Sequence, residues 1–207
     1  MAVDLLWMLI RAASGLVCVA CLLRAYLQWL RISPLNPLTQ LCFRLTNWLV
    51  LPMRRVVRPV AGLDTSSLLA ACLVSFVAAI LKWALFVTDV APAVDATDAG
   101  LPTPLAMLLL ALAWVIGWWL RFLVLLVIAH VLMSWFGASP AAEQIRPVLA
   151  AMVEPFMGPL RQLIHRGAPS GLDFSPIVVF LLLQVMLTVH ERVEYSLSAA
   201  LLGLPGL

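Results

Sequence analysis

The side chains able to do chemistry in this 207-residue chain are few, and most lie within apolar segments. The usual metal ligands and nucleophiles are Cys18, Cys21, Cys42, Cys72, His130, His165 and His190. Cys18 and Cys21 form a C-x-x-C, but in an apolar stretch where cysteine behaves as a small hydrophobe. No set of cysteines and histidines has the spacing of a zinc site. We therefore expect no metal and no other cofactor.

Nucleophilic catalysis finds equally little support in the sequence. The candidate serines, which have no nearby histidine and aspartate in triad order, are Ser134, Ser139, Ser170 and Ser175. A glycine-rich phosphate loop is also missing from the sequence. The expectation is a protein that is not an enzyme.

Basic residues inside apolar segments are the next candidates, because ionisable groups within a membrane span are functional hypotheses by default. They are Arg11, Arg24, Lys82 and Arg121. Arg24 and Lys82 lie near span ends, so their side chains are expected to extend toward water. Arg121 is the one expected to lie deep, and Arg24 and Arg121 are the candidates for an intramembrane role. No aspartate or glutamate is predicted deep in a span, which argues against a proton relay.

A motif of proline, arginine and a Gly-Leu-Asp-x-Ser turn occurs twice between apolar segments. The first copy has Pro52, Arg54, Arg55, Gly62, Asp64 and Ser66. The second copy has Pro159, Arg161, Gly171, Asp173 and Ser175. Each copy resembles the surface portion of a membrane hairpin, and it either presents a fixed platform to a partner or lipid or forms a well-capped re-entry turn.

Two roles remain open for the aspartates of the motif. Asp64 and Asp173 each precede an apolar segment, where a carboxylate can cap the free amides of a helix start. Alternatively each forms an ion pair within its repeat, Asp64 with Arg54 or Arg55, and Asp173 with Arg161. Ser66 and Ser175 are expected at the helix caps themselves, the latter followed by a proline typical of a helix start.

The composition is that of an integral membrane protein, since 64% of residues are hydrophobic and 11% are charged. A formal net charge of +3 is too small to indicate nucleic-acid binding, and none is expected. Four spans are predicted in Leu5–Leu30, Ser67–Val87, Leu105–Phe136 and Pro176–His190, followed by a weakly amphipathic tail. The third segment is either one helix bent near Gly117, which we favour, or an interfacial segment followed by a span.

Between the spans of each half, apolar residues recur at helical spacing. The pattern covers Leu38–Leu51 and Glu143–Phe156, and predicts amphipathic helices that lie in the membrane interface. In the first of these, Leu41, Cys42 and Leu45 belong to the apolar face. Arg44 and Asn47 belong to the opposite face.

The two halves align throughout, Trp29 with Trp135 and Arg54 with Arg161 among others. We therefore expect an all-α membrane protein with four spans in two parallel repeats, each of span, interfacial helix, turn and span. The expected divisions are residues 1–88, an acidic external loop at 89–103, and residues 104–207 with the tail. Because each repeat crosses twice, the pseudo-two-fold axis should run along the membrane normal.

Arginine placement predicts the orientation. Residues 31–65 carry Arg31, Arg44, Arg54, Arg55 and Arg58, and residues 137–174 carry Arg146, Arg161 and Arg166. Residues 89–103 carry no lysine or arginine. The positive-inside rule therefore places segments 31–65 and 137–174 in the cytoplasm and both termini outside.

At this point the pattern resembles the YggT family, also called YlmG, of small membrane proteins in bacteria and plastids. The resemblance covers nearly the whole chain. In the first half it is carried by Arg24 to Trp29, Asn36-Pro37-Leu38, Pro52 to Arg55 and Gly62 to Ser66. In the second half it is carried by Ser134-Trp135, Glu154-Pro155, Pro159-Leu160-Arg161 and Gly171 to Pro176.

The resemblance implies no established enzymatic activity and a bacterial inner-membrane location. It implies a factor that organises other membrane processes, such as division, nucleoid distribution or cofactor and complex assembly. We therefore expect a scaffold or assembly factor with a basic cytoplasmic platform. Its expected partners are anionic inner-leaflet lipids, an unidentified membrane protein and, as a further candidate, a second copy of the chain. The alternative is a channel or transporter component in osmotic or ion homeostasis.

Overall fold

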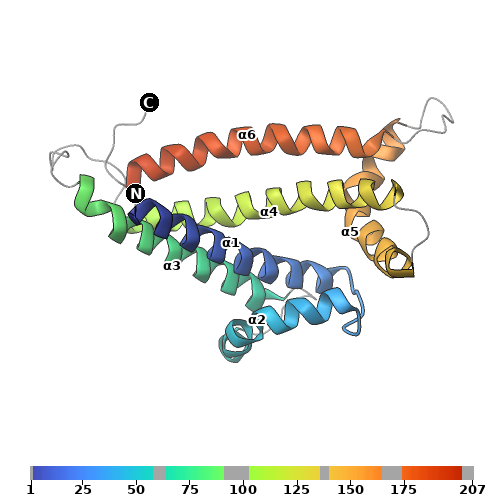
Figure 1. Cartoon of the computed structure of the whole chain (residues 1–207), viewed down its shortest axis with the longest axis horizontal. Coiled ribbons are helices and arrows are strands. Elements are labelled where there is room, and N and C mark those ends of the chain that lie inside the picture. Colours follow the sequence, from blue (N-terminus) through green and yellow to red (C-terminus); the bar gives the residue numbers. More distant parts are fainter. Residues whose placement is uncertain (1, 58–63, 91–102, 136–139, 165–173, 202–207) are drawn as a thin grey trace. The chain divides into compact units, whose positions relative to one another are not determined.

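The computed structural model describes residues 2–57, 64–90, 103–135, 140–164 and 174–201, and within these ranges all regular structure is α-helical (Figure 1). The elements in chain order are α1 (Ala2–Trp29), α2 (Pro37–Val56), α3 (Thr65–Val90), α4 (Thr103–Trp135), α5 (Pro140–Ile164) and α6 (Ser175–Leu201). The all-helical expectation is therefore confirmed for the described residues.

Four of these helices are long and apolar enough to cross a membrane. The segments concerned are Val3–Trp29, Thr65–Phe86, Pro104–Met133 and Ser175–Leu201, with mean hydropathies of 2.1, 2.3, 2.2 and 1.6. Large apolar side chains on these helices remain exposed, as at Met8, Leu125 and Val185. Such surfaces are unfavourable in water but suit the hydrocarbon of a bilayer. The prediction of four candidate spans is confirmed.

The extents of α4 and α6 differ from what the sequence predicted. α4 is one continuous helix of 33 residues, so the alternative of a separate interfacial segment is wrong. The bend expected near Gly117 stays a prediction. α6 continues for 27 residues to Leu201, so its expected end near His190 is also wrong. The reason is that Glu194, which made the tail look amphipathic, is buried and paired inside the protein.

The chain divides into two compact units, which are described separately. One comprises Met1–Trp119 with Val189–Leu207, and the other comprises Leu120–Thr188. In the first unit α1, α2 and α3 pack against one another. One apolar cluster there is built from the buried residues Cys18, Cys21, Leu22, Val50, Ala70 and Ala71. Small side chains at such an interface let helix backbones approach closely, and the C-x-x-C is buried as expected.

A second apolar cluster in this unit joins α3, the beginning of α4 and the end of α6. Its buried members include Ala78 and Ala79 from α3, Leu110 and Trp114 from α4, and Leu201 from α6. The last turns of α6 therefore belong to the core of the first unit. This packing explains why α6 stays helical to Leu201.

Helix α2 starts with a regular cap, because the Asn36 side chain accepts a hydrogen bond of 2.9 Å from the Leu38 amide. Its face toward α1 and α3 is formed by the buried residues Thr39, Cys42, Thr46 and Val50. Its large apolar side chains point away from that face and are exposed at Leu41, Leu45, Trp48 and Leu51. Grouping Cys42 with the leucines on one face was therefore wrong, since the helix has a third face.

In the second unit, α5 carries Pro147, Pro155 and Pro159 and buries Met152, Val153 and Met157. The Phe174 carbonyl accepts the first bonds of α6, from Ile177 at 3.1 Å and Val178 at 3.2 Å. The helix thus begins at Ser175, and the expectation of Ser175 as its cap is off by one residue. The external loop expected at 89–103 lies mostly outside the described residues.

At Gly15, α1 packs directly against the Trp118 side chain of α4. A Cβ added there would overlap the indole ring of Trp118. Gly15→Ala should therefore lower the melting temperature of the purified protein in detergent, since overpacking costs about 1–3 kcal/mol. Gly158→Ala is the matched control, because its added Cβ meets only the flexible Glu154 carboxylate, at 3.1 Å. Equal melting temperatures for the two variants would contradict this packing.

Candidate functional site: a buried ionic network at the base of the first unit

A polar network lies where the end of α1, the middle of α2 and the start of α3 meet. Its centre is the carboxylate of Asp64, whose side chain is 0% exposed. Arg24 reaches it from α1 with only 3% of its side chain exposed, and Arg54 reaches it from the last turn of α2. A carboxylate and a guanidinium removed from water require each other as counter-ions, so this contact fixes three helices at one point.

One carboxylate oxygen carries most of the contacts. Asp64 Oδ2 accepts from Arg54 Nη2 at 2.7 Å and from Ser67 Oγ at 2.9 Å. It also accepts from Arg24 Nε at 3.3 Å. Two cations and a hydroxyl therefore converge on one atom. The other oxygen, Asp64 Oδ1, is buried without a hydrogen-bond partner among the described residues.

Helix α2 supplies the other hydrogen-bond acceptors of the Arg24 guanidinium. Its Nη1 donates to Thr46 Oγ1 at 3.0 Å and to Asn47 Oδ1 at 2.8 Å. Its guanidinium carbon lies 4.5 Å from the ring centroid of Phe43, which is a cation–π distance. These contacts overturn the expectation that Arg24 extends to water, because the side chain is buried and bonded to Asp64, Thr46 and Asn47. They also place Asn47, expected on the outer polar face, inside the network.

The ionisation state of Asp64 follows from these contacts. Burial alone would raise the pKa of this carboxyl, but the hydrogen bonds from Arg54 and Ser67 and the charges of both arginines outweigh it. The net result is a pKa below the ordinary value, so Asp64 is ionised at neutral pH. With one carboxylate and two guanidiniums, the network carries a net charge of +1. Burial raises the pKa of the neighbouring Cys42 thiol to about 11, which keeps that thiol protonated.

Of the two open roles for the Asp64 side chain, the structure supports the ion pair, because among the described residues neither carboxylate oxygen accepts a hydrogen bond from an amide at the start of α3. The backbone carbonyl of Asp64 accepts from the Ser67 and Leu68 amides at 3.0 and 3.2 Å, so the residue occupies the cap position of α3. Its side chain forms the ion pair expected with Arg54, whereas Arg55 is exposed. Ser66 is therefore not the cap. Its hydroxyl donates instead to the carbonyl of Val57 at 3.1 Å, which ties the end of α2 to the start of α3.

The other predicted site residues are not brought together with this network. Pro52 lies on the exposed side of α2, and Gly62 lies outside the described residues. In the second unit Arg161 Nη1 contacts Glu154 Oε2 at 3.2 Å on the surface of α5, and Pro159 is exposed beside it. Ser175 is buried at the start of α6, and Arg121 is half-buried in α4. Gly171 and Asp173 lie outside the described residues, so the second ion pair stays a prediction.

A second ionic cluster, which the sequence interpretation missed, ties α6 to α1, α3 and α4. Arg11 Nη2 lies 2.5 Å from Glu194 Oε1, which also accepts from Trp114 Nε1 at 3.1 Å. Lys82 Nζ donates to Ser198 Oγ at 2.8 Å and lies 5.8 Å from the Trp114 ring centroid. Glu194 therefore lies buried within a candidate span, contrary to expectation, and Lys82 is held inward rather than extended to water.

Histidine and cysteine contribute no metal site to either cluster in the described part of the chain. His190 Nε2 lies 3.8 Å from Glu194 Oε2, one helical turn away. Among the residues that the structure describes, no group of three or more histidine, cysteine, aspartate or glutamate side chains could hold a metal ion. The chemistry that the two clusters offer is therefore charge pairing and hydrogen bonding.

Comparison with known proteins places these residues in a family context. A family model described as CCB3/YggT matches residues 3–85 and 109–192. A protein of Escherichia coli K12 named "Uncharacterized protein YggT" is 33% identical over 202 residues, 97% of each chain. A protein of Vibrio alginolyticus, "Uncharacterized protein in proC 3'region", is 32% identical over 176 residues, 85% of this chain and 88% of that one. No solved structure matches.

The network makes a direct prediction for Asp64→Asn. Asparagine caps a helix about as well as aspartate, so loss of the cap alone would change little. Loss of the counter-ion leaves Arg24 buried without its partner and should cost about 3–5 kcal/mol of unfolding free energy. The measurement is denaturant unfolding in mixed micelles.

Two further variants control this experiment. Arg55→Gln removes an exposed charge next to Arg54 and should change stability by less than about 0.5 kcal/mol. The double variant Arg24→Gln with Asp64→Asn replaces the pair by neutral amides and should be more stable than Asp64→Asn alone. If the Asp64→Asn protein were as stable as the parent, the ion pair would not contribute to the stability of the fold.

Proposed function

The chain belongs to the CCB3/YggT family, and from this premise we propose that it is a non-enzymatic scaffold or assembly factor of the bacterial inner membrane. The observation that carries the proposal is the buried Arg24–Asp64–Arg54 network. A membrane anchor needs only apolar spans and flanking charges. A buried ionic contact between α1, α2 and the residue before α3 instead holds the end of α2 against the start of α3, as a surface for a partner requires.

The fixed region presents a distinct chemistry. Arg44 and Arg55 are exposed on α2, and the exposed apolar stripe of the same helix includes Leu45 and Trp48. This combination is typical of a helix that lies in a membrane interface. In the orientation proposed from the arginines, this platform faces the cytoplasm. Each arginine near anionic inner-leaflet lipids contributes about 1 kcal/mol of attraction.

We further propose that the chain contains two parallel repeats, with the second platform less basic than the first. The family model matches two segments of similar length, which supports a repeat. The spacing between Trp29 and Trp135 places His130 at the position that Arg24 holds in the first half. Because histidine is a weaker cation than arginine at neutral pH, the second half lacks a strict counterpart of the buried pair. The first platform is therefore the better candidate for a membrane-protein partner.

A photocrosslinking amino acid at Arg55 tests this proposal in native membranes. Arg55 is exposed on the platform, so we expect a crosslink to a membrane protein that mass spectrometry can identify. The same amino acid at Tyr195, which is exposed on α6, should not give that product. Asp64→Asn should abolish the Arg55 crosslink while leaving the chain in the membrane. Crosslinks of equal yield at both positions, or at neither, would refute a partner-specific platform.

A second candidate function, a component of ion transport, is favoured by the Arg11–Glu194 cluster. A buried carboxylate with an arginine and a lysine nearby, all within candidate spans, is the kind of arrangement that ion pathways use. On this account Glu194→Gln should abolish ion flux in proteoliposomes. Glu191→Gln, on the exposed side of the same helix, is the matched control. Absence of flux with the parent protein would eliminate this candidate and leave the scaffold.

A further inference from the structure

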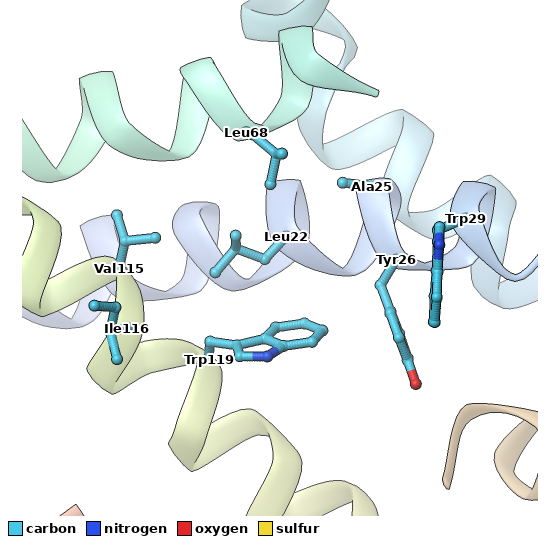
Figure 2. A pocket seen from close by; sticks show the side chains of 8 residues that line it. All are labelled: Leu22, Ala25, Tyr26, Trp29, Leu68, Val115, Ile116 and Trp119. Carbon is cyan, nitrogen blue, oxygen red and sulfur yellow. The ribbon is translucent and has the colours of Figure 1, made fainter. Parts of the chain in front are cut away.

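An apolar pocket of about 320 Å³ lies between α1, α3 and the beginning of α4, within the first unit (Figure 2). Aromatic side chains dominate one end of it, where Tyr26 stacks on Trp29 with 5.8 Å between ring centroids. Trp119 from α4 meets Tyr26 edge-on at 5.1 Å. Leu68 from α3 and Ala25 from α1 line the wall between the helices. This size is in the range of pockets that hold small ligands.

The pocket follows the last turns of α1. Its α1 lining extends from Leu22 to Trp29, which is about 10 Å of helix. Trp29 is the last residue of the candidate span and is 50% exposed. Ile116, on the α4 side, is 55% exposed. The pocket thus extends from the last residue of the candidate span back along α1, and exposed side chains stand at Trp29 and Ile116.

Arg31 follows the pocket residue Trp29 by two positions and has an unusual backbone conformation. Its φ is 55°, the left-handed region that glycine adopts without cost and arginine does not. The Arg31 amide donates to Gln28 O and the Ile32 amide to Leu27 O, both at 3.0 Å, which is the bonding pattern of a Schellman cap. Arginine therefore occupies a position that the turn would leave to glycine. A non-glycine residue in this region is a backbone outlier, and such outliers suggest a role for the side chain.

The charge of Arg31 lacks a counter-ion in the described part of the chain. The ion pairs described above involve Arg11, Arg24, Arg54, Arg161 and His190, and none of them includes Arg31. Arg31 is exposed, and its Cα can be at most about 7 Å from that of Trp29. An exposed cation therefore lies close in the chain to the aromatic end of the apolar pocket.

We propose that this is a binding site for an anionic phospholipid, with one acyl chain in the pocket and the headgroup phosphate on Arg31. The apolar lining matches the chain, and the guanidinium matches the phosphate. The Tyr26–Trp29 pair lies at the level of the glycerol region, where amphipathic aromatic side chains are favoured. The site goes beyond the proposed platform on α2, from which it differs in residues and in ligand contact.

Lipid titration of the full-length protein by native mass spectrometry tests the site. The probes are phosphatidylglycerol and phosphatidylcholine with identical acyl chains. The parent protein should bind phosphatidylglycerol in preference to phosphatidylcholine. Arg31→Gly removes the cation while supplying the residue that the turn favours. It should weaken phosphatidylglycerol binding about tenfold with an equal or higher melting temperature.

Arg192→Gln is the matched control, because it removes one exposed arginine near the end of α6 and should leave phosphatidylglycerol binding unchanged. Ala25→Phe should fill the pocket and weaken binding of both lipids. If Ala25→Phe also lowers the melting temperature, its effect on lipid binding is not used, and the comparison of Arg31→Gly with Arg192→Gln tests the site. Equal losses in Arg31→Gly and Arg192→Gln, or no preference between the lipids, would overturn the site. The Arg55 crosslink can fail while this binding persists, so the two proposals are tested separately.

Discussion

A charged side chain that is buried in a membrane span needs its counter-ion inside the protein, and the first unit of this chain is arranged around that constraint. Arg24 is almost completely buried near the end of α1. Leaving its guanidinium in a low-dielectric environment without a partner would be far more costly than any packing gain nearby. The start of α3 supplies the carboxylate of Asp64, and α2 supplies the neutral acceptors Thr46 and Asn47. The burial of the Arg24 guanidinium thereby determines where α2 and the start of α3 lie against the end of α1.

The same principle operates at the other end of α1. Arg11 and Arg24 are separated by about 20 Å of helix, and each is paired with a carboxylate from a different helix, Glu194 and Asp64. Helix α1 therefore connects to α3 and α2 through one ion pair and to α6 through the other. Between the two pairs the contacts are between small apolar residues, including Cys18 and Cys21. Polar contacts specify where the helices meet, and small residues permit their close approach.

The sequence predicted those features that depend on local order. Four apolar segments predicted four candidate spans. The recurrence of arginine before aspartate suggested an ion pair of Asp64 with Arg54 or Arg55, and Arg54, 10 residues away, is the partner. The partner of Arg24 could not be predicted in this way, because 40 residues separate it from Asp64 and only the packing of α1 on α3 brings them together. Asn47 was misplaced because the sequence pattern was divided into one apolar and one polar face. Helix α2 has three: a face packed against the protein, an exposed apolar face and a polar face. Glu194 was misplaced because an acid near the end of an apolar segment resembles a polar tail.

The most direct test of the buried ion pair is solid-state NMR of the full-length protein in lipid bilayers, with ¹³C-labelled aspartate and ¹⁵N-labelled arginine side chains. Asp64→Asn identifies the Asp64 carboxylate signal by its disappearance. The structure predicts strong dipolar coupling of that carboxylate to guanidinium nitrogens, persisting in an Arg54→Gln protein because Arg24 remains 3.3 Å away. A carboxylate signal that loses all arginine coupling in Arg54→Gln would contradict the central role of Arg24.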